Sequence, residues 1–289
     1  MQWWVYLQVN KVKILSLLAI FIILGCEDEQ KVYSISEVPS VFTKKVLIEE
    51  FTGAWCGYCP DGAYRLENLI ISNAENIIGV STHSGDAMEV SQTSFLESTY
   101  QNIGYPSGMV DRISYNGYVT LSRGYWEYIS SNQLSKIASC GLAIKSNVNG
   151  NTATVEVHAG FSSPHSGDHR LTVYLIEDEV RGEGNGYDQM NFYDTDSYSP
   201  FFNLGNPIIG YVHNHTLRAV LSQPLGDLIN STELVTGGEH ISTFNVDISS
   251  YDHNNLSIVA FINFVGDTYL DHEVLNVQKC SIDGFQDWD

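Results

Sequence analysis

The chain has 289 residues, of which 43% are hydrophobic and 12% aromatic, and it carries a formal net charge of -20 at pH 7. This composition is typical of a globular protein with enough apolar material for about two cores. Because so acidic a chain repels phosphate groups, its charge argues against nucleic acids and anionic lipid headgroups as partners.

The first residues predict export and a lipid anchor. Lys11 and Lys13 precede an apolar run, residues 14–24, whose length is typical of a signal peptide and short for a transmembrane helix. The run ends in a small residue followed by Cys26, as at the cleavage site of a lipoprotein. We expect residues 1–25 to be removed and Cys26 to carry two acyl chains, which anchor stably where one does not. An ordinary signal peptide with an unrelated cysteine is the alternative.

An acidic stretch follows the predicted anchor. Residues 26–42 are expected to form a tether, and they begin with the run Glu27-Asp28-Glu29 directly after the cysteine. A run this short is consistent with a solvated tether and equally with a tag for the cell surface. The side of the membrane on which the protein lies is therefore left open.

Two cysteines, Cys56 and Cys59, lie one helical turn apart. Residues 45–51 predict a buried strand and the apolar residues after Cys59 recur at helical spacing, so Cys56 is expected at a strand-to-helix junction. There the positive end of the helix dipole stabilises a thiolate, and Cys59 is near enough to resolve a mixed disulfide. Trp55 and Tyr58 would flank the pair with apolar surface.

The competing interpretations of this cysteine pair are a zinc site, an inert structural disulfide and chance. A zinc site needs about four ligands, usually including a second close pair of Cys or His residues. The sequence has no second Cys-x-x-Cys. The pattern thus predicts redox geometry without a metal or cofactor, and whether the pair turns over is left open.

The rest of the first half alternates strands with helices. We predict a strand at 76–81, a helix at 94–101, a turn entering a strand at 103–112 and a helix at 125–137. This order is typical of an α/β domain, which we assign to residues 43–138.

From residue 139 onward, short segments of alternating polarity dominate. Strands are predicted at 153–158, 171–176, 217–221, 244–248, 256–264 and 274–282. This pattern predicts an all-β antiparallel sandwich domain over residues 139–289. The stretch 181–206, rich in Gly, Tyr, Asp and Asn, is expected to be an insertion or surface loop.

Two cysteines of the second half, Cys140 and Cys280, have no assigned chemistry. In an oxidising compartment they form either a structural disulfide that ties the ends of the domain or two buried free thiols. Sequence alone does not choose between these alternatives.

Three histidines are candidates for site residues. His213 and His215 would share one face of a strand, as a two-histidine metal site requires, but no third ligand is identifiable. Structural use is therefore favoured, and no metal is predicted. His83 is interpreted as a polar loop residue.

The first half resembles the thioredoxin fold. The stretch Trp55-Cys56-Gly57-Tyr58-Cys59 matches the family's active-site turn, and Pro106 matches the cis-proline that faces it. The resemblance implies that Cys56 is the attacking thiol and Cys59 the resolving thiol. An ordinary trans bond before Pro106 is the alternative.

The same resemblance implies further site residues. Glu50, six residues before the first cysteine, would accept a proton from the resolving thiol, and Glu49 on the opposite face is the alternative acid. Tyr105 would offer backbone pairing to an extended substrate peptide. Trp55 and Tyr58 complete the implied substrate surface.

Nearly the whole mature chain is similar to the twenty-eight-kilodalton outer-membrane protein family of lipoproteins. The stretches that carry this similarity are Glu50-Phe51-Thr52-Gly53 with Cys56 and Cys59-Pro60, Tyr105-Pro106 with Val110-Asp111-Arg112, residues 211–218, and residues 275–279. The resemblance implies a thioredoxin-like domain followed by a β-sandwich on an outer membrane lipoprotein. The family's activity is poorly defined, and some members are regarded as surface antigens or adhesins.

These inferences predict an outer membrane lipoprotein, on the periplasmic face or the cell surface, that exchanges thiols and disulfides with exported proteins. Its membrane contact would be the lipid on Cys26, and an upstream reductant is a further partner that the sequence leaves open. The alternative is a non-enzymatic surface-binding or adhesin-like module in which the Cys56–Cys59 bond is structural.

Overall fold

A computed structural model describes residues 33–73 and 76–289 of the chain. The predicted signal peptide, Cys26 and the first part of the predicted tether lie outside the described residues. Tyr33–Asp289 form one compact unit. Within the described residues, no helix is both long and apolar enough to cross a membrane.

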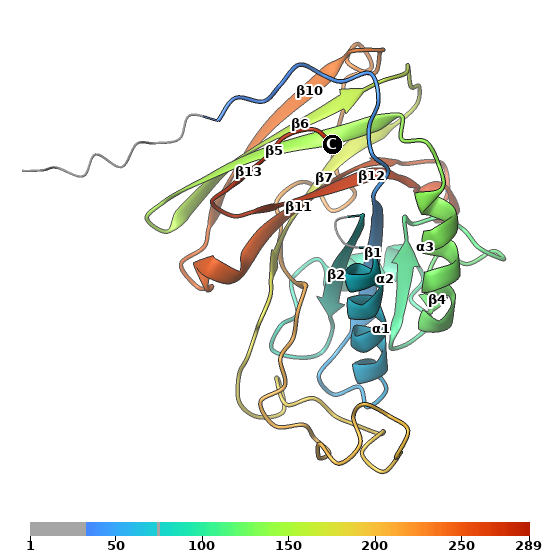
Figure 1. Cartoon of the computed structure of the whole chain (residues 1–289), viewed down its shortest axis with the longest axis vertical. Helices are drawn as coiled ribbons and strands as arrows, with labels where there is room; N and C mark the ends of the chain where they lie inside the picture. Colours follow the sequence, from blue (N-terminus) through green and yellow to red (C-terminus); the bar gives the residue numbers. More distant parts are fainter. Residues whose placement is uncertain (1–32, 74–75) are drawn as a thin grey trace, which may run out of the picture. The chain divides into compact units, whose positions relative to one another are not determined.

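The described residues contain three α-helices and a larger number of strands (Figure 1). The helices are α1 (Cys59–Ser72), α2 (Thr93–Thr99) and α3 (Trp126–Leu134). The strands are β1 (Val46–Thr52), β2 (Ile77–His83), β3 (Ser107–Val110), β4 (Leu121–Ser122), β5 (Cys140–Asn149), β6 (Thr152–Phe161), β7 (His169–Glu177), β8 (Thr216–Val220), β9 (Asp227–Leu228), β10 (Glu239–Asp247), β11 (Leu256–Phe264), β12 (Val274–Ser281) and β13 (Phe285–Gln286). The fold is therefore mixed and rich in β-structure.

Most of these elements lie where the sequence predicts them, but the sequence pattern predicts no strand at the position of β5. Residues 140–144 at its start are all buried, so they show no alternation of polar and apolar side chains. A strand that is covered on both faces lacks the period-two pattern by which half-buried strands are recognised. The short strands β4, β9 and β13 gave no signal for a different reason, because each has only two residues.

The strands form two sheets, and the larger one crosses the predicted domain boundary. Its order is β12-β11-β7-β8-β2-β1-β3-β4, with β9 paired to β7, while the smaller sheet has the order β10-β6-β5-β13. The two halves of the chain meet where β8 pairs in parallel with β2, at Ser81 and Thr216. Ser81 also donates its backbone N–H to the His215 carbonyl at 2.7 Å. A boundary at residue 139 stays a prediction, because the sheet is continuous across it.

Alternation along the strands separates three hydrophobic layers. On β11, Ile258 and Ile262 face the core shared with the smaller sheet, while Val259 and Phe261 face a second core that includes α2. On β1, Leu47 joins this second core, whereas its neighbours on either side pack toward α1 and α3 in a third core. Successive side chains of a strand point to opposite faces, so β1 is covered on both sides.

An ion pair between Arg112 and Glu49 is buried in the second core. The Arg112 guanidinium donates to both carboxylate oxygens of Glu49, at 2.7 and 2.8 Å, and to the Tyr174 hydroxyl at 2.9 Å. It also lies 4.9 Å from the ring centres of Tyr100 and Phe261. Because β7 supplies Tyr174 and β11 supplies Phe261, this pair joins β1 to the strands of the second half.

We predict that Arg112→Ala lowers the free energy of unfolding by about 3–5 kcal/mol, because it leaves the Glu49 carboxylate buried without a cation. Denaturant unfolding followed by fluorescence measures this loss. Lys136→Ala is the matched control, since it breaks an ion pair with Glu273 whose partners are 51% and 43% exposed. That control should cost less than about 1 kcal/mol. Equal losses in the two variants would show that Arg112 is not the link that we describe.

Candidate functional site

The two cysteines of the Cys-x-x-Cys motif form a disulfide between β1 and α1. Cys59 is the first residue of α1, and the Cα atoms of Cys56 and Cys59 lie 5.4 Å apart. Cys56 donates its backbone N–H to the Gly53 carbonyl at 3.0 Å, which closes the turn after the strand. Both residues are buried, with exposed fractions of 5% and 1%. The predicted strand-to-helix junction is therefore present.

The adjacent residues Glu49 and Glu50 point to opposite faces of β1. Glu49 faces Arg112 in the second core, as described above. Glu50 faces α1, where its Oε2 accepts a hydrogen bond from Ser81 Oγ at 3.3 Å, and its Oε1 has no hydrogen-bond partner within residues 33–73 and 76–289. A Cβ atom at position 62 would collide with Glu50 Oε1, so Gly62 of α1 leaves the space that this carboxyl occupies.

The environment of Glu50 favours its neutral form. The side chain is fully buried, and this burial raises the pKa of Glu50 from 4.5 to about 8. The hydrogen bond from Ser81 and the more distant charges of His215 and Arg123 act in the opposite direction but are weaker. An acid that titrates near neutral pH beside a disulfide can both give and take a proton.

The implied substrate residues lie around the disulfide turn. The Tyr105–Pro106 peptide bond is cis, and Pro106 packs against the position of Gly62 on α1. Trp55 is half-exposed, donates its indole N–H to the Ser84 carbonyl at 2.7 Å and lies with its ring centre 5.0 Å from that of Tyr105. Tyr58 is also half-exposed, on another part of the turn.

A segment of the second half is hydrogen-bonded to the turn that contains the disulfide. This segment is residues 187–193, and we call it the strap. The buried Gln189 amide lies within hydrogen-bond distance of the carbonyls of Gly53, Ala54 and Cys56, at 3.4, 3.2 and 2.9 Å. The strap belongs to the yellow-to-orange loop at the bottom of Figure 1. These hydrogen bonds hold it beside the start of α1. The sequence indicated only a surface loop here, and nothing in its residue types indicated contact with the cysteines.

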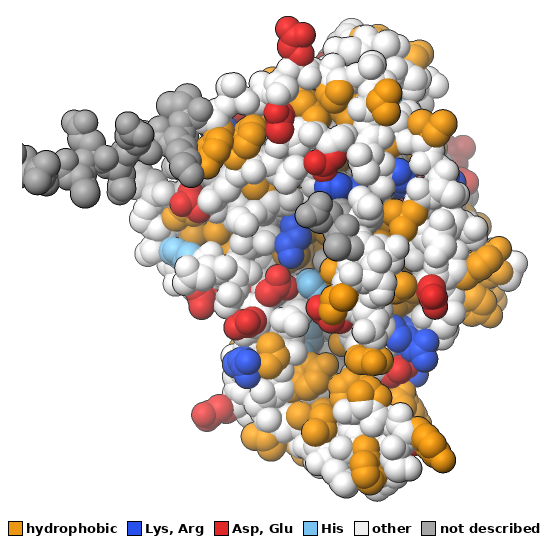
Figure 2. Space-filling model, viewed as in Figure 1, with side chains coloured by type: hydrophobic (Ala, Val, Ile, Leu, Met, Phe, Trp, Pro, Cys, Tyr) orange, Lys and Arg blue, Asp and Glu red, His pale blue; other side chains and the backbone are white. Residues whose placement is uncertain are grey.

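The strap also contacts the disulfide turn through its backbone and an aromatic ring. Met190 and Phe192 donate backbone N–H groups to the carbonyls of Ala54 and Gly57, at 2.7 and 2.9 Å. The Phe192 ring also packs edge-on against Tyr58, with ring centres 5.1 Å apart. The loop that contains the strap exposes further large hydrophobic side chains, and Figure 2 shows hydrophobic side chains gathered at the end of the molecule where this loop lies. Those exposed in residues 191–210 are Phe192, Tyr198, Phe202, Leu204 and Ile209.

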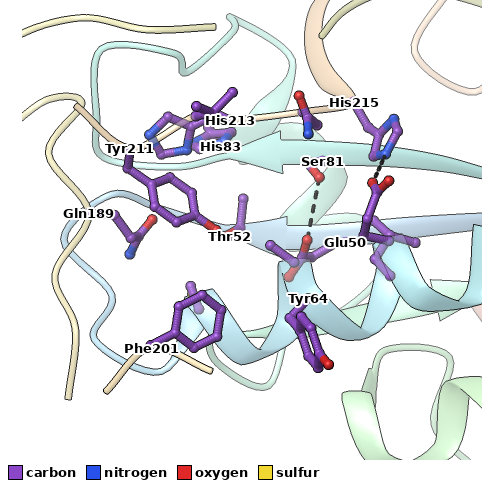
Figure 3. Close-up of a pocket in the computed structure, with 16 residues that line it drawn as sticks. Glu50, Thr52, Tyr64, Ser81, His83, Gln189, Phe201, Tyr211, His213 and His215 are labelled. Atoms are coloured by element: carbon purple, nitrogen blue, oxygen red, sulfur yellow. Dashed lines mark hydrogen bonds and ion pairs between the residues drawn. The ribbon is translucent and has the colours of Figure 1, made fainter. Parts of the chain in front are cut away.

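A cavity of about 180 Å³ lies between α1, β2 and the loop of the second half (Figure 3). Its inner end is lined by Glu50, Ser81 and Cys59, and its wall on the loop side is formed by Gln189, Phe201 and the segment 211–215. Figure 3 shows the Tyr211 ring reaching from that segment toward Thr52. The cavity thus brings Cys59 and the buried acid Glu50 together with side chains at least 130 residues away in the sequence.

The histidines around this cavity serve structural contacts. His83 is buried and pairs with Asp86 at 2.7 Å. His213 binds the Tyr187 carbonyl through Nε2 at 2.8 Å, and burial lowers its pKa to about 4. A carbonyl only accepts hydrogen bonds, so the Nε2 of the neutral imidazole carries the proton and its Nδ1 is left as an acceptor.

His215 differs from His213 in its backbone conformation and in the direction of its pKa shift. Its positive φ of 57° precedes the start of β8, so it does not continue a regular strand through position 213. Its ring nitrogens contact Glu67 at 3.0 Å and Asp178 at 3.1 Å. Although burial opposes the effect, these two carboxylates raise the pKa of His215. Among the described residues no three potential ligands gather into a metal-binding group.

The two remaining cysteines do not pair. Cys140 and Cys280 are separate buried thiols, so of the two alternatives that the sequence left open the structure has the free thiols and not the disulfide. On β12, the residue that meets Cys140 is Asn276, whose side chain donates to the Cys140 carbonyl at 2.8 Å. Cys280 lies four residues further along the strand, which is about 13 Å at the usual rise per residue. Such a separation along the strand is beyond the reach of a disulfide.

The sequence matches the model of the family described as outer membrane protein Omp28 over residues 93–285. The match includes Tyr105, Pro106, the strap and the segment 211–215, and it begins after the two cysteines of the disulfide. It therefore covers less of the chain than the sequence resemblance implied. No curated protein matches the chain.

Two solved structures are similar in fold. HBP35 of Porphyromonas gingivalis superposes with a TM-score of 0.66 at 20% sequence identity, covering 84% of this chain and 76% of that one. Protein AGR_C_4864 from Agrobacterium tumefaciens superposes with a TM-score of 0.51 at 11% identity, covering 82% of this chain and 94% of that one. At such identities the likeness concerns the fold alone. Because the family match spans well over half of the sequence, the chain belongs to the Omp28 family of outer membrane proteins.

Proposed function

We propose that this protein is an exported thiol–disulfide oxidoreductase whose residues 43–138 form a thioredoxin-like part. In this proposal Cys26 carries the lipid that anchors the chain to the outer membrane, and the strands of the second half support the site as a sandwich. The observation that carries the proposal is the shared cavity wall of Cys59 and Glu50, where a disulfide and a buried acid without a cation meet.

The proposed reaction uses each of these groups once. A substrate thiolate attacks Cys56 Sγ, forms a mixed disulfide and expels Cys59 as a thiolate, which takes the proton of the Glu50 carboxyl. A second substrate thiolate then attacks the substrate sulfur, so the substrate leaves as a disulfide and Cys56 leaves as a thiolate. The start of α1 stabilises that thiolate through its free N–H groups. The reverse sequence reduces a substrate disulfide.

Protein substrates fit the surroundings of the disulfide better than small thiols do. Trp55, Tyr58 and Phe192 expose aromatic surface beside the two sulfur atoms, both of which are buried in the turn. Aromatic side chains supply much of the contact energy of protein interfaces. We therefore propose thiols and disulfides of exported proteins as the substrates, with an upstream dithiol as the source of electrons when the protein acts as a reductant.

A specific observation favours a second candidate function, in which the protein binds at the cell surface and the disulfide is structural. The strap makes several hydrogen bonds to the disulfide turn, and such a clasp stabilises a permanent cross-link as well as a reactive one. The two functions differ in the reactivity of Cys56, which is open to direct measurement.

We predict that the reduced protein attacks a chromogenic aromatic disulfide through Cys56, so Cys56→Ser abolishes the reaction above background. Cys59→Ser should retain the first attack and stop at the mixed disulfide, because no resolving thiol remains. The released aromatic thiolate is followed by its absorbance. A variant lacking both cysteines measures the background from the buried thiols of Cys140 and Cys280. If Cys56→Ser reacts as the wild type does, the cysteine pair is not the reactive site.

We also predict that Glu50→Gln stabilises the oxidised protein increasingly as the pH rises from about 4.5 to about 8. In this window the unfolded chain has released the Glu50 proton while the folded chain still holds it, so the stability of the wild type falls with pH. Above the window the difference between the two proteins should be constant. Denaturant unfolding at several pH values measures it.

The matched control for that series is Glu127→Gln, which removes an exposed carboxyl from α3. Its stability difference from the wild type should lack the rise that Glu50→Gln shows. Parallel pH profiles for Glu50→Gln and the wild type would mean that the folded chain ionises Glu50 as readily as the unfolded chain does.

A further inference from the structure

The cavity beside the disulfide extends from the buried acid to the surface. Glu50 is 0% exposed, whereas Tyr64, another residue of the lining, is 46% exposed. A volume of about 180 Å³ is well above the space that one water molecule needs. The polar groups of Ser81, Tyr211 and His213 along the lining supply the hydrogen-bond partners that buried water requires. The cavity thus has the size and the lining of a hydrated channel.

Glu50 has no direct route for a proton other than this cavity among its described contacts. Its Oε1 lies against Gly62 of α1 and has no hydrogen-bond partner among the described residues. Its Oε2 is bound to Ser81, which belongs to the cavity wall. The charged groups Asp61, Arg123 and His215 act on it through their fields and not by contact.

The wall that closes this cavity comes from the second half of the chain. Tyr211 precedes β8 and lines the same cavity as Glu50, and its ring reaches toward Thr52 (Figure 3). His213 keeps its Nδ1 as a free acceptor, because its Nε2 is bound to Tyr187. Together they offer a hydroxyl that can donate or accept and a nitrogen that can accept, which is what a chain of water molecules needs.

We propose that this cavity holds a chain of water molecules that solvates Glu50 and carries its proton to and from solvent, and that Tyr211 and His213 position these waters. The proposal rests on the function proposed above and adds a role for the second half of the chain. When Cys59 leaves as a thiolate and takes the proton of Glu50, the resulting carboxylate regains a proton from the water chain. In the reverse direction the same chain removes the proton.

The titratable and charged groups that face Glu50 or the cavity come from every element packed around it. They are Cys59, Asp61, Tyr64 and Glu67 on α1, His83 on β2, Arg123 before α3, and Tyr211, His213 and His215 before β8. A test must therefore follow Glu50 itself and not a general pH profile of the protein.

The test is an infrared titration of the Glu50 carboxyl in the oxidised protein, with the band assigned by its loss in Glu50→Gln. Ala63→Leu fills the cavity from α1, and Tyr211→Phe removes one hydroxyl without changing the shape of the side chain. Both variants should raise the titration midpoint of Glu50, and Ala63→Leu by about one pH unit, because the carboxylate loses solvating water. Tyr128→Phe, an exposed tyrosine on α3, is the matched control and should leave the midpoint unchanged.

Equal midpoints in wild type, Ala63→Leu and Tyr211→Phe would overturn the proposal, because the cavity would then contribute no solvation. If Ala63→Leu does not fold, Tyr211→Phe decides the matter alone, since it adds no atoms to the cavity. The titration needs no turnover of the disulfide. A failure of the exchange reaction in the wild type would therefore refute the proposed function and leave this measurement intact.

Discussion

The central constraint of this structure is that β1 carries two adjacent acids into two different buried layers. Glu49 enters the layer between β1 and the strands of the second half, where Arg112 compensates its charge. Glu50 enters the layer under α1, where no cation among the described residues contacts it and one of its oxygens has no hydrogen-bond partner in that part of the chain. A strand covered on both faces must accommodate both side chains, because neighbouring residues cannot share a face. Glu49, whose charge is compensated, links β1 through Arg112 to β7. Glu50, whose charge would not be compensated, lines the same cavity as Cys59 of the disulfide.

The second half of the chain contributes to the site as well as to the core. The larger sheet continues from β1 and β2 through β8 into β7, β11 and β12, so the loop between β7 and β8 returns to the sheet beside β2. From that loop, Gln189 binds the disulfide turn and Tyr211 lines the cavity beside Glu50. Without the second half, the disulfide turn would lose its hydrogen bonds to the strap. The cavity beside Glu50 would lose its outer wall.

The local features of the site were accessible from the sequence, and the distant ones were not. Cys56 and Cys59 are three residues apart and follow a strand, so their junction with α1 follows from periodicity alone. The resemblance named Glu50 with Glu49 as the alternative, but the residues alone did not explain this choice, because it depends on Arg112, which lies 63 residues beyond Glu49. Gln189 is 133 residues from Cys56, and an amide in a polar loop carries no signal of its partner.

Capture of mixed disulfides in the native envelope shows whether the Cys56–Cys59 pair exchanges disulfides with exported proteins, as we propose. A Cys59→Ala variant cannot resolve the intermediate, so we expect a discrete set of proteins that are bound through Cys56 and released by a reductant. The variant that also carries Cys56→Ser should capture none of them. Equal capture by the two variants, or none by either, would refute the proposed exchange and favour a structural role of the bond.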